Sequence, residues 1–179
     1  MKKAGIGLVI LLVAMVGLYL VNNRESSDDF LEDEFTAIEK HIPKRDVLNE
    51  EVSTADVAWH LDHMLKTINR ISENLEASDP HDYAYKFSMQ QVVVHTTGMI
   101  PRGVAQSPQN VRPPKVIETD SIYVQLQEAK RNIKGISNLD KNSHFNHPVF
   151  NKLDRDQTRR FLEIHTNHHL KIIQDILGE

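Results

Sequence analysis

Apolar residues recur at helical spacing through most of the chain and predict an all-α domain. Over residues 53–76, apolar side chains fall three or four positions apart, which places them on one face of a helix. They are Val57, Leu61, Met64, Leu65, Ile68, Ile71 and Leu75. The same spacing predicts helices over residues 28–41, 83–97, 122–136 and 154–177. Such a set of amphipathic helices is most simply a helical bundle.

Two loops interrupt this pattern. Residues 98–114 contain prolines and glycines at several positions, and loops of this length within a domain are usually functional or mobile. Residues 138–151 form the second predicted loop. The run Val92–Val94 would also be compatible with a strand, but no partner strand is evident in the sequence.

The N-terminus predicts a membrane anchor. Residues 4–21 carry no charge, and a helix rising about 1.5 Å per residue would cover roughly 27 Å, close to the hydrocarbon core of a bilayer. A cleaved signal peptide is the alternative, but no Ala-x-Ala site follows the apolar run. Lys2 and Lys3 precede the run and acidic residues follow it, which favours a domain outside the cytoplasm.

From this we predict a single-pass protein of a bacterial cell membrane. Residues 1–25 would be a cytoplasmic stub and transmembrane anchor, and residues 26–179 a helical domain on the extracytoplasmic side.

Charge and composition exclude several classes of function. With a net charge of -4 and a pI near 6.2, the chain lacks the positive charge that would attract nucleic acid. The absence of cysteine excludes disulfides, thiolate nucleophiles and cysteine-ligated metal centres.

The histidines are the candidate functional residues. His165 and His169 lie four residues apart on the last predicted helix, so they would project from one face. At about 100° per residue, His60 lies about 70° from the centre of the apolar face of its helix, at the border of the core. His63 lies about 130° from that centre and should face solvent or a neighbouring edge.

The apolar residues of the last helix centre close to the line through His165 and His169, so both should point inward. Together with His60 they predict a metal site with His60, His165 and His169 as ligands. Neutral imidazoles bind divalent zinc, nickel or iron, and three of them leave coordination positions open for water or substrate. For any one histidine, a hydrogen-bonded residue at the core edge is the simpler interpretation, and only the joint pattern favours metal. No catalytic residue can be named, and His63, His147 and His168 have no assigned role.

The last fifth of the chain resembles a known signature. Residues 147–153, followed by residues 165–170 and Gln174, are similar to the C-terminal motif of the DinB-like (YfiT-type) superfamily, in a branch of bacterial domains of unassigned function. Trp59–Leu61 sits where that superfamily places its first ligand. The resemblance covers roughly residues 28–177.

The resemblance implies a four-helix bundle with up-down-down-up connectivity, here with one extra helix and a long loop. It also implies a divalent metal held by His60, His165 and His169. Relatives include thiol-dependent S-transferases and proposed metal-dependent hydrolases. The expected function is therefore a membrane-anchored, metal-dependent S-transferase or hydrolase acting on a small molecule, such as a low-molecular-weight thiol. The alternative is a non-catalytic helical binding module of the cell envelope, and a homodimer is left open. Asn151 departs from the glycine usual in this motif.

Overall fold

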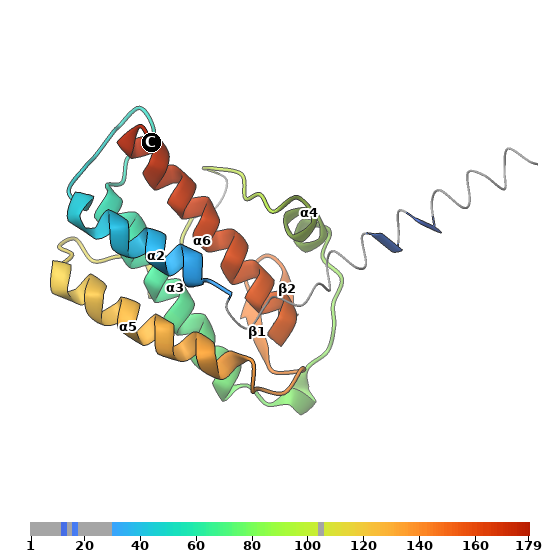
Figure 1. Cartoon of the computed structure of the whole chain (residues 1–179). Helices are drawn as coiled ribbons and strands as arrows, with labels where there is room; N and C mark the ends of the chain where they lie inside the picture. The colour runs from blue at the N-terminus through green and yellow to red at the C-terminus, as the bar shows by residue number, and fades with distance from the viewer. Residues whose placement is uncertain (1–11, 14–15, 18–29, 104–105) are drawn as a thin grey trace, which may run out of the picture.

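The computed structural model describes residues 12–13, 16–17, 30–103 and 106–179, and over these ranges the chain is mostly helical. This confirms the all-α class. The helices are α2 (Glu32–His41), α3 (Val57–Ala77), α4 (Met89–Thr97), α5 (Thr119–Ile136) and α6 (Arg155–Leu177) (Figure 1). Three short 3-10 helices accompany them, η1 (Ile42–Lys44), η2 (Pro80–Asp82) and η3 (Gln109–Val111).

The long helix α3 forms the centre of the packing. It contacts α5 and α6 extensively, while α2 packs on α6 (Figure 1). The strand β1 (His144–His147) and the short helix η3 also pack against α3, so that it is covered on most sides. Each buried Leu or Ile side chain in this core contributes roughly 1.5–3 kcal/mol through removal of apolar surface from water. Core side chains with no exposed surface include Ile38, Leu61, Leu65, Ile68, Leu75, Ile122, Leu126, Leu162 and Ile173.

The ends of the two longest helices follow from local hydrogen bonding. The side chain of Asp56 accepts the Trp59 N–H at 2.8 Å and starts α3. Asp154 and Gln157 form a capping box at the start of α6, and Gly178 ends that helix with φ 68°. The predicted limits of both helices are therefore confirmed to within a few residues.

Two other predicted helices also begin later than the sequence pattern suggested. The helix expected from Tyr83 starts at Met89, because the hydroxyl of Ser88 accepts the Gln91 N–H and caps the chain there. The first helix starts at Glu32, after Leu31 at φ 72°. The first two positions of that prediction, residues 28–29, lie outside the described residues.

A small β-hairpin replaces most of the second predicted loop. Strands β1 (His144–His147) and β2 (Asn151–Asp154) pair antiparallel, with His147 opposite Asn151. The turn is held by Nδ1 of His147, which accepts the N–H groups of Val149 and Phe150, both at 3.1 Å. Asn151 adopts φ 66°, a left-handed conformation that glycine adopts freely and asparagine tolerates. The asparagine at this position is thus compatible with the turn.

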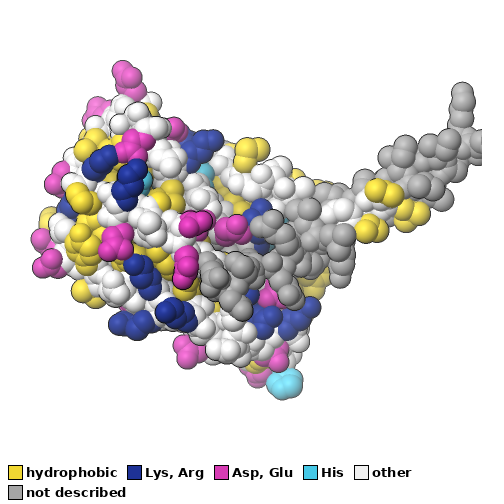
Figure 2. All heavy atoms as spheres, viewed as in Figure 1, with side chains coloured by type: hydrophobic (Ala, Val, Ile, Leu, Met, Phe, Trp, Pro, Cys, Tyr) yellow, Lys and Arg dark blue, Asp and Glu magenta, His cyan; other side chains and the backbone are white. Residues whose placement is uncertain are grey.

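The prediction of a single-pass membrane protein is contradicted. No helix in the described ranges has the length and apolar character needed to cross a bilayer. Of the proposed anchor over residues 4–21, only residues 12–13 and 16–17 are described, and the rest of that prediction lies outside the described residues. On the face shown in Figure 2, Lys and Arg side chains are interspersed with Asp and Glu.

We expect Asn151→Ala to destabilise the protein by about 1 kcal/mol, because an alanine side chain is strained in the left-handed region. Asn151→Gly should stay within about 0.5 kcal/mol of the wild type, since glycine adopts this φ without strain. Chemical denaturation measures both. Asn146→Ala, at an exposed position of β1, is the matched control. Equal stability of the alanine and glycine variants at position 151 would contradict the turn geometry.

Candidate metal centre

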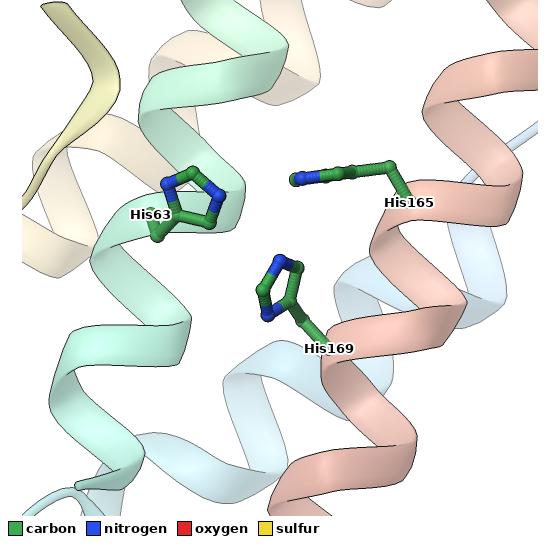
Figure 3. A group of neighbouring side chains, drawn as sticks. All are labelled: His63, His165 and His169. Carbon is green, nitrogen blue, oxygen red and sulfur yellow. The ribbon is translucent and has the colours of Figure 1, made fainter. Parts of the chain in front are cut away.

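Three histidines from two helices meet between α3 and α6. His63, His165 and His169 each offer a ring nitrogen, and these nitrogens all lie within 4.8 Å of one another. Figure 3 shows the ring of His63 on α3 facing the rings of His165 and His169, which project one above the other from α6. His165 and His169 lie close together because their four-residue spacing on α6 corresponds to about one helical turn.

The structure brings two of the three predicted ligands, His165 and His169, into this group. The third predicted ligand, His60, lies beside the group instead of in it. Its Nδ1 is 3.0 Å from Nδ1 of His169, and its Nε2 is 3.1 Å from the hydroxyl oxygen of Ser53. Both ring nitrogens of His60 are therefore engaged with neighbouring side chains.

In this group the histidine from α3 is His63, whereas the sequence pattern predicted His60. Of the two environments expected for His63, solvent or a neighbouring edge, the structure shows the second, since only 3% of its surface is exposed. That expectation used the apolar face of α3 alone, whereas α6 and η3 cover the side of the helix that carries His63. Trp59, one turn earlier, stacks on the His63 ring with centroids 5.0 Å apart. An aromatic residue four positions before a histidine was a sequence signal for this burial.

The hydrogen bonding of His63 suits a metal ligand. Its Nδ1 lies 2.9 Å from the carbonyl oxygen of Val111. A carbonyl can only accept, so Nδ1 must carry the hydrogen and the lone pair of the neutral ring lies on Nε2. Metal-binding histidines commonly donate their other N–H to a backbone carbonyl in this way, which fixes the ring and its tautomer.

Burial keeps the group uncharged. It lowers the pKa of His63, and it lowers the pKa of His165 and His169 well below the ordinary value of 6.5, with neighbouring histidines adding to the effect for the latter two. At neutral pH the three rings are therefore unprotonated, which is the form that binds metal. Nδ1 of His165 is buried and has no hydrogen-bond partner among the described residues. The donor set fits a divalent cation that prefers imidazole.

The remaining histidines near the centre have other environments. His147 holds the hairpin turn and stacks on Phe150 with centroids 4.2 Å apart, which gives it a structural role. His168 is half-buried on α6, beside His169. His95 on α4 is fully buried, and neither of its ring nitrogens has a hydrogen-bond partner among the described residues.

Acid should destabilise the metal-free protein between about pH 6.5 and about pH 4. Burial lowers the pKa of His60, His95 and His147 to about 4, from 6.5 in an ordinary environment. In this window the unfolded chain binds more protons than the folded chain, so the free energy of unfolding falls as the pH falls. The slope is up to about 1.4 kcal/mol per pH unit for each such histidine.

Chemical denaturation of chelator-treated protein across this pH range measures the slope. His95→Phe should flatten it, because one of the titrating groups is removed. The exposed His81, replaced by phenylalanine, serves as the control. A stability that stays constant from pH 6.5 to pH 4 would rule out this account of the buried histidines.

Comparisons with protein-family models, with curated proteins and with solved structures find no match to this chain. The family resemblance of residues 147–174 therefore stays a prediction. What the structure establishes at this site is a group of three close histidines that could hold a metal ion.

Proposed function

We propose that this chain is a DinB-like domain that binds one divalent cation through His63, His165 and His169. The single observation that carries the proposal is the approach of three imidazole nitrogens to within 4.8 Å of one another. In this proposal α2, α3, α5 and α6 form the four-helix bundle with up-down-down-up connectivity, and α4 is the additional helix. Zinc, nickel and iron are the candidate ions, because imidazole nitrogen suits all three.

The protein groups around the centre would orient the ligands and limit access of water. Val111 holds the ring of His63 through its carbonyl oxygen, and Trp59 covers one face of that ring. Three protein ligands leave at least one coordination position open, as in catalytic rather than closed structural sites. A divalent cation held by these three residues would lower the pKa of a water molecule at the open position, polarise a substrate oxygen or hold a thiolate.

The reaction class that we propose is transfer to a thiol or hydrolysis, with a small-molecule substrate such as a low-molecular-weight thiol. A non-catalytic binding module is the second candidate. The composition of the group favours this alternative, since it contains three histidines and no carboxylate that could serve as a general base. Both candidates require the cation, and turnover separates them.

The full-length protein should bind about one zinc, nickel or ferrous ion per chain. His165→Ala should lose the ion, with a fall in affinity larger than the roughly 10–100-fold typical of residues outside the coordination sphere. Elemental analysis after metal loading and desalting gives the stoichiometry, and competition with a chromophoric chelator gives the affinity. His81→Ala, at an exposed position of η2, is the matched control.

Replacement of His63 tests the ligand set directly. His63→Ala should lower the affinity as strongly as His165→Ala does. Wild-type protein without stoichiometric metal under all three loading conditions would refute the proposed function. Normal binding by His63→Ala would refute the assignment of that residue.

Metal-loaded protein should turn over a small-molecule electrophile with a thiol, or a hydrolysable ester or amide. Chelation should abolish the activity and restored metal should recover it, because the cation supplies the activating charge. A panel of thiols and electrophiles, followed by chromatography, measures this, with His165→Ala as the inactive reference. Stoichiometric metal without turnover across the panel would favour the binding module.

A further inference from the structure

His60 extends the candidate metal centre outward from His169. Its side chain is only 4% exposed, and its two ring nitrogens face two different partners. Nδ1 lies 3.0 Å from Nδ1 of His169, and Nε2 lies 3.1 Å from the hydroxyl oxygen of Ser53. The three side chains thus form one continuous hydrogen-bonded chain that ends in the loop before α3.

Ser53 is itself held in place by that loop. Its hydroxyl oxygen accepts the N–H of Ala55 at 3.0 Å, and its own N–H donates to the carbonyl oxygen of Asn49 at 3.0 Å. The next residues lead directly into the cap of α3 at Asp56. Ser53, at the end of this series of hydrogen bonds, is therefore held in place by backbone contacts.

Two arrangements of hydrogens satisfy this chain. In the first, Nδ1–H of His169 donates to Nδ1 of His60, and Nε2–H of His60 donates to Ser53. In the second, the hydroxyl of Ser53 donates to Nε2 of His60, and Nδ1–H of His60 donates to His169. A neutral imidazole carries only one hydrogen, so the second arrangement places the hydrogen of His169 on Nε2 and removes that lone pair.

Only the first arrangement leaves Nε2 of His169 able to bind a cation. We propose that His60 is a positioning residue which, anchored by Ser53, holds His169 in this tautomer and orientation. This inference rests on the proposed function, because it concerns the same cation. His60 then accepts the Nδ1–H of His169, as the carbonyl oxygen of Val111 accepts the Nδ1–H of His63.

The Val111 carbonyl, which orients His63, and the His60 ring, which orients His169, differ in one chemical respect. The carbonyl of Val111 can only accept, so it fixes the tautomer of His63 by itself. An imidazole can either donate or accept, so His60 fixes the tautomer of His169 only when Ser53 accepts from its other nitrogen. The role of His60 therefore depends on a residue in the loop as well as on its own ring.

Two substitutions of His60 separate positioning from packing. Asparagine places an amide oxygen near the position of Nδ1 and keeps an acceptor for His169, whereas leucine fills similar space without one. We expect His60→Leu to weaken binding of zinc to the full-length protein about 10–100-fold. His60→Asn should recover at least half of that loss on a logarithmic scale. Competition with a chromophoric chelator measures the affinities, and His81→Leu is the matched control.

Ser53→Ala supplies a variant that leaves the helix core unchanged, since Ser53 is a half-buried loop residue. We expect a smaller loss of zinc affinity than for His60→Leu. Nitrogen-15 NMR of the imidazoles reads the tautomer directly. The zinc-loaded wild type should show hydrogen on Nδ1 of His169 and on Nε2 of His60, and circular dichroism shows that each variant is folded.

Several outcomes would overturn the inference. If His60→Leu and Ser53→Ala bind zinc as tightly as the wild type while His165→Ala does not, the positioning role is wrong and the proposed function stands. If His60→Leu abolishes binding and His63→Ala does not, His60 is a ligand and not a positioning residue. If the wild type binds no metal, both proposals fail.

Discussion

The contact between α3 and α6 is the constraint on which the candidate metal centre depends. Apolar side chains of both helices bury one another, and the same contact brings His63 against His165 and His169. Removal of these rings from water makes their charged forms costly, so the helix packing also determines their protonation state. A group of uncharged imidazoles is therefore a direct result of the packing of two helices.

Much of this arrangement follows from local sequence. The apolar spacing of α3 and α6, together with the capping side chains of Asp56 and Asp154, places both helices to within a few residues. The four-residue spacing of His165 and His169 is likewise a local property, because it holds for any α-helix. These parts of the fold and of the site could be predicted because they need no information on what surrounds the helix.

The remaining parts depend on contacts between distant segments. His63 lies on a side of α3 that the pattern of this helix alone places toward solvent or a neighbouring edge. Its burial comes from α6 and from η3, which follows about 50 residues later in the chain. The hairpin arises because His147 binds two backbone N–H groups and Asn151 accepts a positive φ. The hydrogen bonds of His147 and the positive φ of Asn151 leave no periodic pattern in the sequence. Periodicity therefore assigned residues 138–151 to a loop.

The stacking of Trp59 on His63 has a practical consequence. Trp59 is the single tryptophan of the chain, and its ring lies with its centroid 5.0 Å from that of His63 and 5.2 Å from that of His60. Indole fluorescence responds to the charge and electron demand of an adjacent ring. The tryptophan emission of this protein therefore originates beside the histidine group. It provides an intrinsic optical signal for metal binding or protonation at these rings without any added label.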